Sequence, residues 1–232
     1  MKFEAQPDRD PAVVRAMFER VARRYDLTNH LLSGGLDFWW RARAFEIVRQ
    51  WEPQRVLDLA TGSGDLALTI QRKLPEAEII GADFSPEMLA AARRKGLKKT
   101  VIADALHLPF AVGHFDVVTV AFGLRNMADW SAALREMQRV LRPDGHLLVL
   151  DFSLPDGFLR PIYRAYLHRC LPWIAGFITK EREAYQYLGA SIEKFPSGPA
   201  MCDLLRQSGF HDATAEPLSG GIVTLYCATR AR

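Results

Sequence analysis

Five short apolar segments recur through the middle of the chain, and stretches with the apolar spacing of helices separate them. Nearly continuous apolar strands that alternate with helices are typical of a parallel sheet with helices on both faces. The pattern therefore predicts a doubly wound, Rossmann-like α/β fold. The predicted strands are Val56–Leu59, Glu78–Asp83, Thr100–Ala103, Phe115–Ala121 and His146–Leu150.

Signals for helix boundaries support this division. Ser85 is a good N-cap residue and precedes Pro86, which is favoured at the first helical position. Asp129 can cap the following helix, whose apolar stripe includes Leu134 and Met137. The turn Pro143–Gly145 then leads into the fifth strand.

Further elements are expected on both sides of the alternating region. Two helices precede it, while a late helix and a terminal hairpin follow it and bring the sheet to seven mostly parallel strands. The intervening segment Phe152–Pro196 is aromatic and broken by prolines, so it is interpreted as a helical insertion. We expect residues 1–232 to form one domain. The flanking elements are Pro11–Arg24, Phe38–Trp51, Pro199–Gln207, His211–Glu216 and Ile222–Thr229.

Composition excludes several classes of function. The net charge is only +3 with the signs mixed, so nucleic acid is not an expected partner, and the basic stretch 93–99 is interpreted as a solvated helix end. Cys170, Cys202 and Cys227 form no Cys-x-x-Cys pair, and the histidines lack ligand spacing, so no metal is expected. Without a signal peptide or a spanning apolar run, the chain is expected to be cytoplasmic.

A glycine-containing turn follows the first strand and opens the next helix. It reads Gly62-Ser63-Gly64-Asp65, with Asp58 in the strand before it. Glycine lets the backbone turn sharply and approach a ligand closely. Asp83 ends the second strand, where a carboxylate can accept hydrogen bonds from both hydroxyls of an adenosine ribose. This combination predicts a binding site for an adenosine-containing cofactor.

The charge at this helix start distinguishes two cofactor classes. A dinucleotide places its pyrophosphate at the helix N-terminus, where Asp65 would repel it. S-adenosylmethionine instead carries a cationic sulfonium and ammonium, which Asp65 and Asp58 would attract. The local charge therefore favours S-adenosylmethionine. For Asp65 alone, a simple helix cap is the alternative.

Asp104 and Ala105 follow the third strand, where such folds usually hold an adenine ring. The Asp104 carboxylate could accept a hydrogen bond from the exocyclic amine. The alternative is that Asp104 is a turn residue before Leu108.

The chain resembles the ubiquinone/menaquinone biosynthesis C-methyltransferases from Phe18 to about Val223. The family's usual threonine, glycine and asparagine are replaced by Ser63, Thr61 and Asp104, changes that affect cofactor affinity rather than class. The matching segments are Phe18–Asn29, Asp58–Asp65, Ala121–Asn126, Ala133–Met137, Leu148–Ser153, Tyr185–Leu188 and Leu218–Val223.

The resemblance implies a class I methyltransferase fold and transfer of a methyl group from S-adenosylmethionine to a ring carbon of a polyprenylated hydroquinone. The implied reaction is demethylmenaquinol to menaquinol and the equivalent step on a ubiquinol precursor. A quinone ring is electron-poor, so the acceptor has to be the reduced quinol, preferably as a phenolate held in line with the methyl group.

The candidates for catalysis of this reaction follow the fourth strand, at the carboxyl edge of the sheet. Arg125 would stabilise the developing phenolate, Asn126 would orient a ring oxygen, and Tyr25 would add a contact from the N-terminal cap, residues 1–51. Arginine is a poor proton acceptor, which favours an electrostatic role over a general-base role. The alternative for Arg125 is a structural ion pair with Asp129 or Glu136.

The polyprenyl tail gives the aromatic insertion a role under this interpretation. Residues 152–198 would form a lid over the substrate, and the alternative is a helical extension of the core. Trp173 and Phe177, flanked by Arg164, Arg169 and Lys180, predict peripheral attachment to the inner face of a membrane. A homodimer or a biosynthetic complex is also expected.

Other functions stay open at this point. They are a methyltransferase for another small aromatic or lipid acceptor, a nucleic-acid methyltransferase, a nicotinamide dehydrogenase, and a non-catalytic protein that binds the cofactor. The sequence does not distinguish a naphthoquinol from a benzoquinol acceptor.

Overall fold

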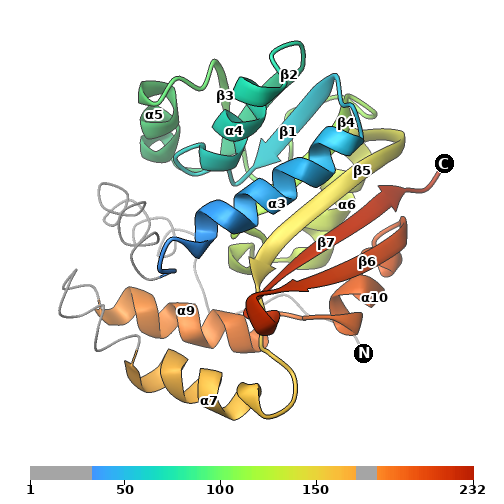
Figure 1. Ribbon diagram of the computed structural model, residues 1–232. Helices are drawn as coiled ribbons and strands as arrows, with labels where there is room; N and C mark the ends of the chain where they lie inside the picture. Colours follow the sequence, from blue (N-terminus) through green and yellow to red (C-terminus); the bar gives the residue numbers. More distant parts are fainter. Residues whose placement is uncertain (1–32, 171–181) are drawn as a thin grey trace.

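The computed structural model describes residues 33–170 and 182–232, and a seven-stranded sheet forms their centre (Figure 1). The strand order is β3-β2-β1-β4-β5-β7-β6, with β1 to β5 parallel and β7 antiparallel to both of its neighbours. The predicted fold is confirmed. The strands are β1 (Arg55–Leu59), β2 (Glu78–Asp83), β3 (Lys99–Ile102), β4 (Phe115–Ala121), β5 (Leu141–Phe152), β6 (Phe210–Leu218) and β7 (Val223–Arg230).

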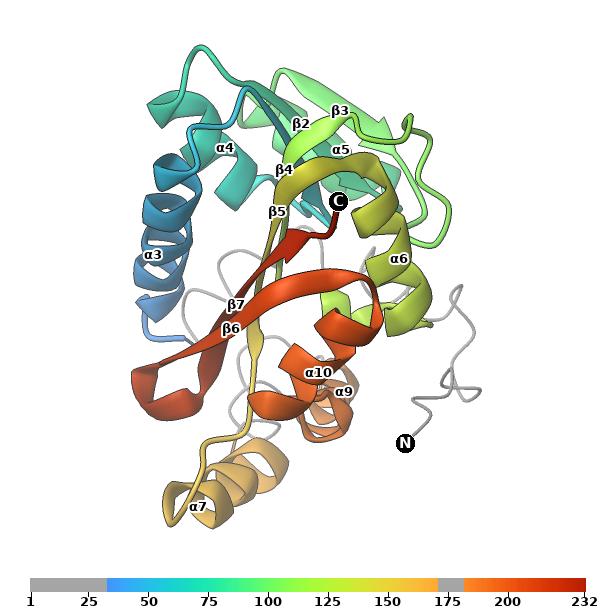
Figure 2. The same ribbon diagram turned by 90° about the vertical axis from the view of Figure 1, so that its right-hand side faces the viewer.

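Helices cover both faces of the sheet (Figure 2). On one face lie α3 (Leu36–Gln50) and α4 (Asp65–Lys73), and on the other lie α6 (Trp130–Val140) and α10 (Pro199–Gln207). The remaining helical elements are α5 (Pro86–Arg94), η1 (Leu124–Asn126), α7 (Leu159–Ala165), the π-helical turn η2 (Tyr166–Cys170), α9 (Arg182–Lys194) and η3 (Ser219–Gly221).

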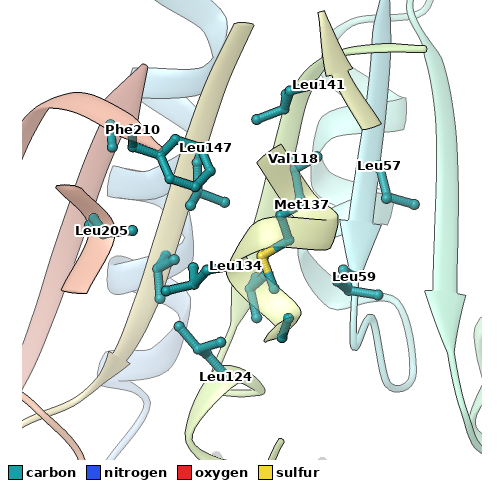
Figure 3. Close-up of a cluster of buried hydrophobic side chains, with 14 of the residues drawn as sticks. Leu57, Leu59, Val118, Leu124, Leu134, Met137, Leu141, Leu147, Leu205 and Phe210 are labelled. Carbon is teal, nitrogen blue, oxygen red and sulfur yellow. The ribbon is translucent and has the colours of Figure 1, made fainter. Parts of the chain in front are cut away.

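Alternation along the strands divides the core into two buried clusters. Leu147 and Val149 of β5 pack with α6 and α10, whereas Leu148 and Leu150 belong to the cluster under α3 and α4. Figure 3 shows part of the first cluster, in which Met137 of α6 lies near strand residues. Period-two alternation of this kind arises because successive side chains point to opposite faces of a sheet.

Both predicted helix caps are confirmed. The Ser85 hydroxyl accepts a hydrogen bond from the Met88 N–H, with Pro86 next in the chain, and the Asp129 carboxylate accepts from the Ala132 N–H at 2.9 Å. The fifth strand begins earlier than predicted, at Leu141. Asp144, expected in a turn before the strand, instead forms an exposed irregularity within it, at a φ of 58°. The register with β4 shifts at the same point.

The insertion after β5 is helical, as predicted, where the structure describes it. The helices α7 and α9 lie beyond the carboxyl end of β5 (Figure 1), with Leu167 and Ile192 buried in a small cluster. The predicted helix at residues 11–24 and the membrane-facing residues Trp173, Phe177 and Lys180 lie outside the described residues. Within the described ranges, no helix is both long and apolar enough to cross a membrane.

Candidate functional site

A pocket opens at the carboxyl ends of β1, β2 and β4, where the strand order reverses direction. Ligands of open α/β sheets bind at this position. The pocket measures about 830 Å³, open solvent at its mouth included. Its lining comes from the ends of these strands, from the loops and the turn η1 that follow them, and from α3, α4 and α5. It includes Arg41, Asp58, Gly62, Ser63, Asp65, Asp83, Phe84, Met88, Phe122 and Asn126.

The Asp58 side chain stabilises the loop that follows β1. Its buried carboxylate accepts hydrogen bonds of 2.6 Å from the hydroxyls of Thr61 and Thr119. Burial raises the pKa of Asp58 to about 6, although these hydroxyl bonds oppose the shift. Gly64 has a φ of 87°, and a Cβ placed on it would lie 3.0 Å from the Ala92 Cβ. The glycine therefore permits both the turn and the close approach of α5.

Asp83 connects the ends of β1 and β2. One of its carboxylate oxygens accepts from the Gly62 N–H and the other from the Ser85 N–H, each at 2.9 Å. Burial raises the pKa of Asp83, while these backbone donors partly offset the rise. The Phe84 N–H is a third backbone donor to this carboxylate, which leaves about one of its four acceptor positions open to a ribose hydroxyl.

Phe84, which sequence reasoning missed, follows Asp83 directly and also lines the pocket. It is 36% exposed, although large aromatic side chains are usually buried. A flat apolar side chain beside the ribose-binding position can stack on an adenine ring. Its place immediately after the strand-ending acid was the available signal.

Asp65 has two basic neighbours that lie far from it in the sequence. The Lys95 ammonium lies 2.8 Å from both the Asp65 carboxylate and the Ser63 hydroxyl, and Arg41 lies 3.7 Å from Asp65. The basic stretch 93–99 is therefore not only a solvated helix end. Asp65 is also not a cap, because Gly64 holds that position without a side-chain bond. Lys95 and Arg41 therefore offset part of the negative charge that the sequence predicted for the rim of the pocket.

The loop after β4 has a strained backbone at Phe122. This residue has a φ of 60°, in the left-handed region that non-glycine residues rarely adopt. Its carbonyl accepts from Arg125 at 2.7 Å and from the Asn126 amide at 3.4 Å. A Cβ on Gly123 would lie 2.5 Å from the Ala60 Cβ, so the loops after β1 and β4 touch.

Arg125 is an ion-pair partner of Asp151. Its Nη1 lies 2.6 Å from an Asp151 carboxylate oxygen, and the two side chains are 4% and 0% exposed. The alternative partners predicted from the sequence were wrong: Asp129 caps α6, and Glu136 pairs with Arg139. Asn126, next in the chain, lines the pocket.

The remaining predicted residues lie elsewhere. The Asp104 side chain is 62% exposed, and its carboxylate accepts from the Leu106 N–H, the geometry of a turn residue. Ala105 packs against the core, and its contact with adenine stays a prediction. Tyr25 lies outside the described residues. In the parts of the chain that the structure covers, no cluster of three or more His, Cys, Asp or Glu side chains could hold a metal ion.

The sheet order and the position of the pocket match the fold of S-adenosylmethionine-dependent methyltransferases, and the family match shows that the protein belongs to this class. The fold is shared with a solved S-adenosylmethionine-dependent methyltransferase from Thermotoga maritima. That structure has a TM-score of 0.66 and 20% sequence identity, and the match covers 93% of this chain and 99% of the other.

The chain belongs to the ubiE/COQ5 methyltransferase family, whose model matches residues 5–230. It is 47% identical over 220 residues to a demethylmenaquinone methyltransferase of Thermus thermophilus, covering 92% of this chain and 100% of the relative. It is 42% identical over 236 residues to a ubiquinone/menaquinone biosynthesis C-methyltransferase of Syntrophotalea carbinolica, covering 99% and 98% of the two chains. The family resemblance seen in the sequence is confirmed.

Proposed function

We propose that the protein methylates a ring carbon of a polyprenylated hydroquinone, with demethylmenaquinol as the principal acceptor and the ubiquinol precursor as a second one. The observation that carries this proposal is the match to the whole length of the Thermus thermophilus demethylmenaquinone methyltransferase. The second acceptor is supported by the Syntrophotalea carbinolica relative, whose name includes both pathways.

The pocket fits S-adenosylmethionine at its adenosine end. Asp83 keeps acceptor capacity for a ribose hydroxyl beside its three backbone donors, Phe84 offers a surface for adenine, and the turn at Gly62 and Gly64 would bring backbone close to the ligand. When bound, the cofactor supplies an electrophilic methyl group on a sulfonium. Asp58 and Asp65 place carboxylates at the side of the pocket where its cationic centres would lie.

Two adjacent residues would prepare the acceptor for attack. Asn126 lines the pocket and can orient a ring oxygen through its amide. Arg125 would favour the phenolate electrostatically, but Asp151 shares its charge, so the pair acts as an oriented dipole rather than a free cation. The shared acceptor, the Phe122 carbonyl, fixes both donors relative to the pocket. Tyr25 would supply a further contact.

The lid and the membrane contact are proposed together, since a polyprenyl tail is delivered from a lipid phase. Phe158 and Ile162 of the α7 region are 79% and 63% exposed, next to the exposed Arg160. Arg164 is also exposed, but it pairs with Glu193 at 2.6 Å. Apolar side chains beside basic ones suit the interface of an anionic bilayer. We expect Phe158→Ser/Ile162→Ser to lower binding to anionic vesicles several-fold. Equal binding by the variant and the parent protein would remove this part of the proposal.

The acceptor is tested by direct assay. The protein is incubated with S-adenosylmethionine and chemically reduced demethylmenaquinol, and separately with the reduced ubiquinone precursor, and products are weighed by mass spectrometry. We expect one added methyl group on demethylmenaquinol and slower methylation of the second quinol. If neither is methylated while cofactor binding is intact, another aromatic or lipid acceptor replaces the quinols.

A further inference from the structure

The charges around the pocket are unevenly distributed. Three carboxylates line it, those of Asp58, Asp65 and Asp83. Among the described residues of the lining, Arg41 supplies the single cationic side chain. The methionine end of the cofactor carries a carboxylate as well as an ammonium, so a cation and an anion placed together would complement both of its charges.

Arg41 is held in place by several contacts on and near α3. Its guanidinium pairs with Asp37, one helical turn earlier, and Asp37 in turn accepts a 2.8 Å hydrogen bond from the Ser33 hydroxyl. The Arg41 side chain is 14% exposed, and its guanidinium carbon lies 5.6 Å from the centre of the Phe122 ring. A guanidinium fixed against an aromatic face is preorganised to bind a carboxylate through two parallel hydrogen bonds.

Arg41 and Asp65 together match the charges of an amino acid. Nη2 of Arg41 and a carboxylate oxygen of Asp65 are 3.7 Å apart, and both side chains line the pocket. Asp37 engages Nη1 of Arg41, and Lys95 engages the other carboxylate oxygen of Asp65. The 3.7 Å separation is longer than a direct hydrogen bond, so Nη2 and the facing Asp65 oxygen retain capacity for a ligand. Arg41 belongs to α3 and Asp65 begins α4, whereas Phe84 follows β2. Phe84 and Asp83 therefore suit the nucleoside, and Arg41 and Asp65 suit the amino-acid end.

Lys95 is the rival cation. It contacts Asp65 and Ser63 from the end of α5, but it is not part of the pocket lining. Its place outside the lining suits a role in fixing the loop after β1.

We propose that Arg41 binds the carboxylate of the methionine moiety of S-adenosylmethionine, while Asp65 accepts from its ammonium. The inference deepens the proposed function, because it rests on the cofactor assigned there. It does not depend on which acceptor is methylated. Arg41 is therefore a specificity residue for the amino-acid end of the cofactor.

The test compares three ligands by isothermal titration calorimetry. S-adenosylmethionine has both amino-acid charges, decarboxylated S-adenosylmethionine lacks the carboxylate, and methylthioadenosine lacks the whole amino-acid end. In the parent protein we expect S-adenosylmethionine to bind about 10- to 100-fold tighter than its decarboxylated form, the range for a charge-assisted hydrogen bond. In Arg41→Gln this preference should fall to about threefold or less, with methylthioadenosine affinity unchanged.

Three variants complete the experiment. Arg43→Gln, on the same helix but paired with Glu216, is the matched control and should retain the full preference. Arg41→Lys keeps the charge and should retain part of it. Lys95→Gln tests the rival cation. The proposal is overturned if Arg41→Gln keeps the preference, if Lys95→Gln abolishes it instead, or if Arg41→Gln weakens all three ligands equally. None of these outcomes requires a quinol, so they separate this inference from the acceptor assignment.

Discussion

Replacing Arg125 with methionine would leave the Asp151 carboxylate buried without its cation. The two side chains are 4% and 0% exposed, and removal of one partner from such a pair costs about 3–5 kcal/mol. Asp151 keeps backbone donors in Arg125 at 3.3 Å and Phe152 at 2.9 Å, which favours the lower end, about 3 kcal/mol. With a urea slope of about 3 kcal/mol per molar, the unfolding midpoint should fall by about 1 M.

Two controls separate this buried pair from ordinary ion pairs. Arg206→Met breaks an exposed pair with Asp203 and should cost less than about 1 kcal/mol. The double variant Arg125→Met/Asp151→Asn removes both charges, keeps an acceptor for the backbone donors of Arg125 and Phe152, and should recover most of the lost stability. If Arg125→Met alone lowered the free energy of unfolding by less than about 1 kcal/mol, the strong coupling inferred for this buried pair would be refuted.

The same variant also tests the catalytic assignment of Arg125. At a temperature where Arg125→Met is folded, turnover on the quinol should fall about 100-fold or more, the range for loss of one electrostatic stabiliser, while S-adenosylmethionine affinity stays within about threefold. Equal losses in turnover and affinity would mean that Arg125 acts through the structure of the cofactor pocket.

Three further predictions concern the cofactor pocket. Gly123→Ala places a Cβ at 2.5 Å from the Ala60 Cβ, so the affinity for S-adenosylmethionine, measured by calorimetry, should fall at least about tenfold. Adding Ala60→Gly removes the clash and should restore the affinity. A double variant as weak as Gly123→Ala would contradict the contact between the two loops. Burial raises the pKa of Asp58 to about 6. A cationic ligand favours the ionised carboxylate, so the affinity for S-adenosylmethionine should rise between about pH 5 and 7, and Asp58→Asn should flatten this rise. If the pH profile of Asp58→Asn equals that of the parent protein, the rise belongs to another group, such as Asp83, whose pKa is also raised. Phe84→Ala should weaken methylthioadenosine binding about three- to tenfold, whereas Phe84→Tyr keeps the aromatic ring and should not weaken it. Unchanged binding by Phe84→Ala would show that adenine lies elsewhere in the pocket.

The sheet was predictable because its signals are local in the sequence. Apolar runs, the cap at Ser85 and the cap at Asp129 each depend on residues within a few positions of one another. The fifth strand was placed too late because Pro143 and Gly145 indicate a turn. The strand in fact continues through these residues, because Leu141 pairs with Phe115 of β4. Pairing between strands cannot be deduced from the sequence of one strand.

The site was predictable only where a motif carried it. Asp58, Asp83 and the glycine turn lie at the ends of recognisable strands, and each of them forms part of the pocket or its support. The partners of charged groups were missed, because Asp151 is 26 residues from Arg125 and Lys95 is 30 residues from Asp65. Such pairs are set by the three-dimensional arrangement of strands and helices, which spacing along the chain does not encode.

The most direct test of the central claim is the position of the transferred methyl group. The protein is given S-adenosylmethionine labelled with ¹³C at the methyl group together with reduced demethylmenaquinol, and the product is examined by NMR after extraction. We expect label on a ring carbon when the quinol is supplied and no product when the oxidised quinone is supplied. Label on a hydroxyl oxygen, equal reaction of the oxidised quinone, or no label despite bound cofactor would contradict it.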